Sequence, residues 1–355
     1  MRIGIIGASS QVGSSIALYL KHFTAEEVIC FIRSEYSGIF FELFGIGYER
    51  VDFTNVVELQ QKLTGLDVVI DCSYPSGQLY AILPAIRNNF NAIIAAMPEK
   101  AVFIYMSSIM AFGMPPGESR LKHYNLPRSS YAYIKRKAEK EMEQLCKKYE
   151  KKGFVFRLSQ VHGFLQSVNS SFREKLSSAS VAFINGSPED LTNTVFINSV
   201  CEAIIKCAKG EVSPGLYTLV SQPQWTLEQL YSYYTVNYDI DCSLQYFKAE
   251  TRPAPKKSLI AGLFGTLKKF RPLLETYVLM QSPKASIIFK GRYRQSEVIR
   301  TVNNGAAAMQ AIDFNLLGPV PFSTISNISS SVSEVTAFEK KLETFYNKVI
   351  TDNWK

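Results

Sequence analysis

Short apolar runs alternate with longer amphipathic segments along the first half of the chain. Runs rich in β-branched residues are typical of buried strands, whereas apolar residues three and four positions apart are typical of helices. The pattern predicts strands at residues 2–6, 28–32, 48–53, 67–72, 101–106 and 154–158, and helices that end near residue 20 or cover 56–63, 80–97 and 131–151. Strands that alternate with helices form right-handed βαβ units, so we expect an α/β fold with a doubly wound parallel sheet.

The alternation of strand and helix patterns is less regular after residue 159. Shorter runs predict strands at 194–197 and 215–220 and helices at 199–209, 226–235 and 334–350. The last of these has one apolar face, and Ser331 with Glu334 is a candidate capping box at its start. We expect a first domain over residues 1–165, continued by parts of 190–220. A smaller, partly helical C-terminal region for substrate binding would then occupy most of 166–355.

Positive charge is concentrated in one segment. The formal net charge is +8, and residues 245–300 hold twelve basic and three acidic side chains, a local balance of +9. Such a segment favours an anionic partner: a diphosphate, a membrane surface or a nucleic acid. An apolar run at 259–264 lies between lysine pairs, so the segment also fits an amphipathic helix at a membrane surface.

The cysteine and histidine content restricts the chemistry. The six cysteines form no CxxC pair and the three histidines lie far apart, so we expect reduced cysteines, no metal site and no Ser-His-Asp triad. No apolar run reaches the roughly 18 residues that a membrane-spanning helix needs. Because the sequence begins directly with a strand pattern, we expect a cytoplasmic protein without a signal peptide.

A glycine-containing turn follows the first strand and opens the first helix. Its glycines, Gly7 and Gly13, have the spacing and context of a dinucleotide-binding fingerprint, in which the helix N-terminus offers amides to a pyrophosphate. Ser10 replaces the usual middle glycine, and its side chain would either crowd the phosphate or bind it. The alternative is a purely structural turn. The cofactor-binding residues expected here are Gly7, Ser9, Ser10, Gln11, Val12 and Gly13.

Residues after three other strands extend this candidate site. Arg33 ends the second strand, where an acidic residue would select NAD(H), and an arginine there suits the 2′-phosphate of NADP(H). Asp52 lies at the third strand, where it either accepts a hydrogen bond from an adenine amino group or simply begins a turn. Ser73 follows the fourth strand. We therefore expect NADP(H) in preference to NAD(H).

Tyr131 and Lys135 lie four residues apart at the start of a predicted helix, with Ser129 or Ser130 as its candidate N-cap. A neighbouring ammonium favours the phenolate and lowers the pKa of a phenol. Such a pair can exchange a proton with an alcohol or a ketone. The same spacing also occurs by chance on ordinary solvated helices.

Ser108 closes the strand that precedes this helix, and its hydroxyl could hydrogen-bond the reacting oxygen. The carboxyl ends of parallel strands share one edge of the sheet, where ligands bind in folds of this class. Because Gly7, Arg33, Asp52 and Ser73 also lie at strand ends, the candidate residues converge on one site.

Three segments together resemble the extended short-chain dehydrogenase/reductases, the group of NAD(P)-dependent nucleotide-sugar epimerases, dehydratases and reductases. They are the glycine turn 7–13, the serine segment 107–113 and the Tyr-Lys segment from Tyr131 to Glu139. The resemblance covers about residues 1–235 and includes Arg157 as a later landmark. It implies a Rossmann-type fold and hydride transfer to or from a nicotinamide. It also implies that Ser108, Tyr131 and Lys135 are catalytic, with Lys135 also binding the nicotinamide ribose.

The resemblance also indicates the reaction and the partners. Ile109 and Met110 follow Ser108, where the family's 4,6-dehydratases carry an Asp-Glu pair. We therefore expect a reductase or 4-epimerase acting at a carbinol or ketone of a nucleotide sugar, with no nucleic-acid partner. Arg252 is the candidate phosphate ligand. The resemblance further implies a homodimer formed through the helices at 80–97 and 131–151.

Two alternatives stay open. One is a membrane-associated reductase of a lipid-like or polyketide-like ketone, with residues 256–271 lying on an anionic membrane. The other is a non-catalytic sensor that binds NADP and regulates a partner. The intact Tyr131 and Lys135 pair favours an enzyme, since a sensor needs no proton donor.

Overall fold

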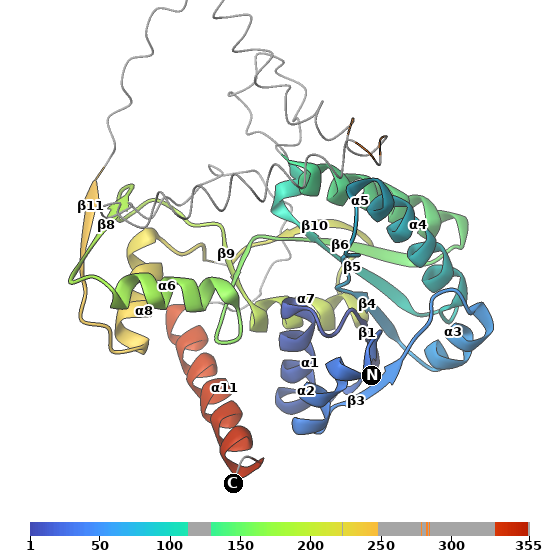
Figure 1. Cartoon of the computed structure of the whole chain (residues 1–355), viewed down its shortest axis with the longest axis horizontal. Helices are drawn as coiled ribbons and strands as arrows, with labels where there is room; N and C mark the ends of the chain where they lie inside the picture. Colours follow the sequence, from blue (N-terminus) through green and yellow to red (C-terminus); the bar gives the residue numbers. More distant parts are fainter. Residues whose placement is uncertain are drawn as a thin grey trace, which may run out of the picture.

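A parallel sheet of seven strands forms the centre of the molecule (Figure 1). The computed structural model describes residues 1–112, 129–221, 223–247 and 331–353, with the single residues 278, 282 and 284. The sheet order is β10-β6-β5-β4-β1-β2-β3. The strands are β1 (Arg2–Ile6), β2 (Glu27–Ile32), β3 (Gly47–Arg50), β4 (Val68–Asp71), β5 (Val102–Ser108), β6 (Lys152–Leu158) and β10 (Gly215–Leu219).

Helices cover both faces of this sheet, which confirms the predicted doubly wound α/β fold. One face packs against α1 (Gln11–Phe23), α2 (Gly38–Leu43) and α7 (Ile197–Ala208), and the other against α3 (Val56–Leu63), α4 (Leu79–Ala96) and α5 (Ser130–Lys148). Because central strands are covered on both sides, they are almost continuously apolar, and all four residues of β4 are buried. The strand predicted at 48–53 ends at Arg50, so Asp52 lies beyond it.

A smaller lobe contains α6 (Ser167–Ser177), β8 (Val181–Asn185), α8 (Leu227–Asn237) and β11 (Ser243–Phe247). Its core is rich in aromatic side chains, among them Phe172, Trp225, Tyr231 and Tyr234. Strands β8 and β11 pair in parallel, as do the short strands β7 (Gln160–His162) and β9 (Thr194–Phe196). The sequence pattern did not predict α6, β8 or β11. The helix is polar with three buried residues, and each strand is only five residues long.

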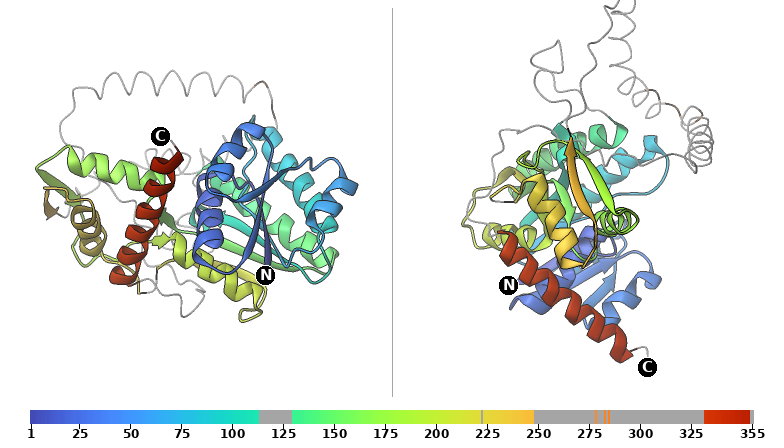
Figure 2. Two further views of the ribbon diagram at one scale, coloured as in Figure 1. Left: turned by 90° about the horizontal axis from the view of Figure 1, so that it is seen from below. Right: turned by 90° about the vertical axis from the view of Figure 1, so that its left-hand side faces the viewer.

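The last helix, α11 (Val332–Asn353), extends from the smaller lobe to the sheet domain (Figure 2). Val335 contributes to the core of the smaller lobe, and Leu342 contributes to the core beneath α1 and α7. The predicted capping box is present. The Ser331 hydroxyl accepts the Glu334 N–H at 3.4 Å, and the Glu334 carboxylate accepts the Ser331 N–H at 3.2 Å. The predicted amphipathic tail helix is therefore confirmed.

Several predictions concern residues outside the described part of the chain. Arg252, the run 256–271 and most of the basic segment 245–300 belong there, so their predicted roles stay predictions. Among the helices that the structure describes, none combines the length and the apolarity needed to cross a bilayer.

Candidate active site

Neighbouring strands bring most of the candidate residues to one edge of the sheet. Strands β5, β4, β1 and β2 lie side by side in this order. Ser108 ends β5, Ser73 follows β4, the glycine turn 7–13 follows β1 and Arg33 follows β2. All of these positions are at the carboxyl ends of parallel strands, as the sequence predicted.

The glycine turn is tight at both of its glycines. Gly7 has a φ of +68°, and a Cβ there would lie 2.6 Å from the main-chain nitrogen of Ser73. A Cβ on Gly13 would lie 2.6 Å from the Gly7 carbonyl oxygen. The Ser10 hydroxyl accepts the Gly13 N–H at 3.1 Å and so forms the N-cap of α1. The middle position is therefore used to begin the helix, whose N-terminus faces the sheet edge.

Arg33 and Asp52 lie at the β2 and β3 side of this edge, and both are exposed. The Asp52 carboxylate accepts the main-chain N–H of Thr54 at 2.9 Å and the Thr54 hydroxyl at 2.8 Å. These hydrogen bonds lower the pKa of Asp52. Asp52 thus begins a turn, which is one of its two predicted roles, and its contact with an adenine amino group stays a prediction. Arg33 is exposed just beyond the end of β2.

Helix α5 carries the Tyr-Lys pair. Ser129 forms its predicted N-cap, with the hydroxyl accepting the Ala132 N–H at 3.2 Å. Tyr131 keeps 38% of its surface exposed, whereas Lys135 is only 5% exposed. The Lys135 ammonium donates a 2.8 Å hydrogen bond to the carbonyl of Met106 in β5. One turn of helix thus separates a phenol at the surface of the site from an ammonium on its floor.

Three tyrosine rings surround this ammonium. Its nitrogen lies 4.7 Å from the ring centroid of Tyr105, 5.5 Å from that of Tyr74 and 5.8 Å from that of Tyr131. Aromatic faces attract cations at such distances. Burial nevertheless lowers the pKa of Lys135 to about 8, a shift that the charge of the nearby Asp71 partly opposes.

The pKa of Tyr131 differs from the sequence-based expectation. Burial raises it above the ordinary value, and the hydrogen bond with Ser108 opposes this rise. The direction is therefore opposite to the lowering that we expected from Lys135, because burial outweighs the effects that favour the phenolate. The structure places Ser108 close to Tyr131, and their predicted catalytic roles stay predictions.

Asp71 is a site residue that the sequence motifs did not identify. It ends β4 and is 1% exposed, and its carboxylate accepts the Ser73 N–H at 2.7 Å. Burial raises its pKa, whereas the hydrogen bond to Ser73 and the charge of Lys135 oppose the rise. A carboxylate at the end of the otherwise apolar run 68–71 was the available signal in the sequence.

A buried ion pair holds α5 against the sheet behind the site. Glu139 accepts hydrogen bonds from Arg157 Nε at 3.0 Å and Nη2 at 2.6 Å. The Ser107 hydroxyl donates to the same carboxylate at 2.5 Å. Glu139 lies one turn after Lys135, and Ser107 directly precedes Ser108. This network therefore joins the helix of the Tyr-Lys pair to the strand end that carries the serine.

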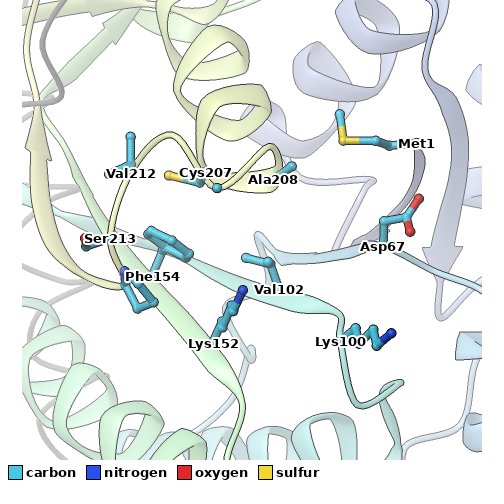
Figure 3. A pocket seen from close by; sticks show the side chains of 12 residues that line it. Met1, Asp67, Lys100, Val102, Lys152, Phe154, Cys207, Ala208, Val212 and Ser213 are labelled. Carbon is cyan, nitrogen blue, oxygen red and sulfur yellow. The ribbon is translucent and has the colours of Figure 1, made fainter.

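Two further cavities lie away from this edge. One, of about 350 Å³, lies at the amino ends of the strands, because Val102 and Lys152 begin β5 and β6 there (Figure 3). The other, of about 680 Å³, lies between α5 and β10 and is lined by Arg136, Met142 and Leu216 among others. Neither cavity includes Tyr131, Ser108 or the glycine turn.

The geometry at the carboxyl edge fits a dinucleotide. The cradle formed by Gly7 and Gly13 leaves no room for a Cβ, and the start of α1 offers main-chain amides as a pyrophosphate site requires. At the β5 end of the same edge, the Ser108 hydroxyl lies close enough to Tyr131 to affect its pKa. A glycine turn and a pair of hydroxyls at one edge of a Rossmann-type sheet are typical of dinucleotide-dependent enzymes, the class to which this chain is similar.

The chain belongs to the NAD dependent epimerase/dehydratase family, whose model matches residues 3–208. The members of this family are enzymes. No curated protein matches the sequence.

Solved structures share the fold at low sequence identity. UDP-N-acetylglucosamine 4-epimerase from Bacillus cereus is 15% identical, with 77% of this chain and 96% of that chain covered and a TM-score of 0.54. UDP-glucose 4-epimerase from Thermotoga maritima is 17% identical, with coverage of 77% and 100% and a TM-score of 0.51. dTDP-glucose 4,6-dehydratase from Bacillus anthracis, solved with NAD, is 14% identical, with coverage of 76% and 96% and a TM-score of 0.54.

Proposed function

We propose that this chain is an NADP(H)-dependent oxidoreductase that transfers hydride at a carbinol or ketone of a nucleotide-sugar-like substrate. The observation that carries the proposal is that Ser108 and Tyr131 lie close together on the sheet edge that also holds the glycine turn. Family membership supports a dinucleotide cofactor. The neighbouring structures include epimerases of UDP-sugars, which supports a nucleotide-sugar substrate.

The residues of the site divide the proton chemistry between them. The bound nicotinamide supplies or accepts the hydride. Tyr131 exchanges a proton with the substrate oxygen, and Ser108 donates a hydrogen bond that polarises the same oxygen. Lys135, when charged, donates hydrogen bonds that hold the nicotinamide ribose. Because burial keeps the Tyr131 pKa above its ordinary value, the phenol enters the reaction protonated, which suits reduction of a ketone.

The segment after Ser108 argues against elimination of water. It forms the short helix η2 (Ile109–Phe112), in which Ile109 is 8% exposed and Met110 is 39% exposed. Neither side chain can act as an acid or a base. A reductase or a 4-epimerase needs only the proton exchange that Tyr131 provides, so these two reactions fit the site better than a 4,6-dehydration.

Arg33 supports NADP(H) as the cofactor. It is exposed just beyond β2, where its guanidinium can meet a 2′-phosphate, and the buried Ile32 precedes it where an acid would select NAD(H). Titration with NADPH and NADH tests the choice, with NADPH expected to bind at least tenfold more tightly. Arg33→Ala should remove most of that difference.

The substrate class is tested by turnover. Purified protein is incubated with NADPH and a panel of 4-keto nucleotide sugars, and in parallel with UDP-hexoses and NAD⁺ or NADP⁺ for 4-epimerisation. The proposal expects conversion in one of the two assays and its loss in Tyr131→Phe. If nucleotide sugars are inert while a lipid-like ketone is reduced, the hydride chemistry stands and the substrate assignment is wrong.

A further inference from the structure

We propose that Tyr74 forms one wall of the nicotinamide half of the cofactor site. This residue belongs to the segment after β4 and to none of the sequence motifs that define the site. The inference rests on the proposed NADP(H) function and adds a contact for the reactive end of the cofactor.

Tyr74 lies between the two ends of the expected cofactor path. Strand β4 is flanked by β1, which carries the glycine turn, and by β5, which carries Ser108. The segment after β4 rests directly on the turn, since a Cβ on Gly7 would lie 2.6 Å from the Ser73 nitrogen. On the other side, the ring centroids of Tyr74 and Tyr131 are 5.3 Å apart with their planes at 53°. A dinucleotide that reaches from the turn to Tyr131 must therefore pass Tyr74.

Tyr74 is partly exposed at the surface of the site, as Tyr131 is, whereas the residues beneath them are buried. Tyr74 and Tyr131 are 37% and 38% exposed, whereas Tyr105 is 1% exposed and Lys135 is 5% exposed. The Lys135 nitrogen lies 5.5 Å from the Tyr74 ring, so the tyrosine stands beside the same ammonium that is expected to bind the ribose. The accessible part of the ring thus offers an aromatic surface at the level of Tyr131.

An aromatic ring at this position can bind the nicotinamide. Flat rings pack favourably on tyrosine in tilted or offset arrangements, and the positive charge of an oxidised nicotinamide is attracted by an aromatic face. Tyr74 also stays protonated during the reaction. Burial, together with the charge of Tyr131, raises its pKa to about 12. It therefore positions the cofactor and does not replace Tyr131 as the proton donor.

Paired ligands isolate the contribution of the nicotinamide. Dissociation constants are measured for NADPH and for 2′-phospho-ADP-ribose, which lacks the nicotinamide ring. The proteins are wild type, Tyr74→Phe, Tyr74→Ala and the control Tyr149→Ala, which removes a tyrosine just after the far end of α5.

The proposal expects Tyr74→Ala to weaken NADPH binding about three- to tenfold. The dissociation constant of 2′-phospho-ADP-ribose should change by less than about twofold. Tyr74→Phe should keep most of the affinity because the ring remains, and Tyr149→Ala should resemble wild type. Equal changes for both ligands, no change, or tighter NADPH binding by Tyr74→Ala would overturn the assignment. If wild-type protein binds neither ligand, the NADP(H) function itself fails, and the Tyr74 proposal with it.

Discussion

The Lys135 ammonium donates a 2.8 Å hydrogen bond to the main-chain carbonyl of Met106, two residues before Ser108 in β5. The lysine is thereby anchored to the strand that delivers the serine of the site. Two of its three ammonium protons remain for other acceptors, such as the hydroxyls of a ribose. The same buried position makes the charge of Lys135 sensitive to its surroundings.

Asp71→Asn should move the pH dependence of cofactor binding. Burial lowers the pKa of Lys135 to about 8, and the charge of Asp71 is the largest of the effects that oppose this shift. The ammonium is present below this pKa and is lost as the pH rises through it. Wild-type affinity for NADPH should thus fall near pH 8, and removal of the carboxylate should bring the fall to lower pH.

The measurement is NADPH titration between pH 6 and 9, with Asp67→Asn as a control carboxylate at the opposite edge of the sheet. A profile for Asp71→Asn that coincides with wild type would contradict the dependence of Lys135 on this residue.

Glu339→Gln should change how stability depends on pH. Glu339 lies on α11, and its carboxylate is buried and accepts the Phe164 N–H at 2.6 Å. Burial raises its pKa from 4.5 to about 8. For an acid with a raised pKa, the stabilisation is complete below the unfolded value near 4.5 and is lost progressively as the pH rises toward 8.

Thermal or denaturant unfolding of the two proteins should therefore nearly coincide at pH 5. At pH 8 the glutamine variant should be the more stable by roughly 2–4 kcal/mol. Asp352→Asn, an exposed carboxyl near the end of α11, is the control. Parallel pH profiles for wild type and Glu339→Gln would show that this carboxyl does not titrate in the folded chain.

Glu139→Gln should destabilise the protein because it leaves the Arg157 guanidinium without its carboxylate. Side-chain exposure is 14% for the arginine and 5% for the glutamate, so water replaces the partner poorly. Loss of one member of a buried ion pair costs about 3–5 kcal/mol. Glu143→Gln, at an exposed position one turn later, should cost less than about 0.5 kcal/mol. Equal midpoints of unfolding for the two variants would refute this role of the network.

The sequence predicted the parts of the structure that depend on local periodicity. The alternation of apolar strands and amphipathic helices predicted the parallel sheet. The helix starts predicted Ser129 and Ser331 as capping residues. The residues around Lys135 were less predictable. Tyr74, in the segment after β4, and Tyr105, in β5, lie near the ammonium although they are 61 and 30 positions earlier in the chain, a pairing that no local pattern encodes.

The hydrogen bond of the Lys135 side chain is another contact that local sequence patterns do not predict. Helical spacing correctly places Tyr131 and Lys135 on one face of α5. It does not show that β5 offers a carbonyl acceptor for Lys135, or that burial of the Tyr131 phenol raises its pKa. The smaller lobe was partly missed for a related reason, because its core forms from aromatic residues on several short elements.

Tyr131→Phe tests the central claim most directly, because it removes one oxygen atom from the site and keeps the ring. We expect the variant to bind NADPH within about twofold of wild type and to lose at least a hundredfold in kcat with the substrate found for the wild type. Unchanged turnover in the variant would contradict the role of this phenol as the proton donor.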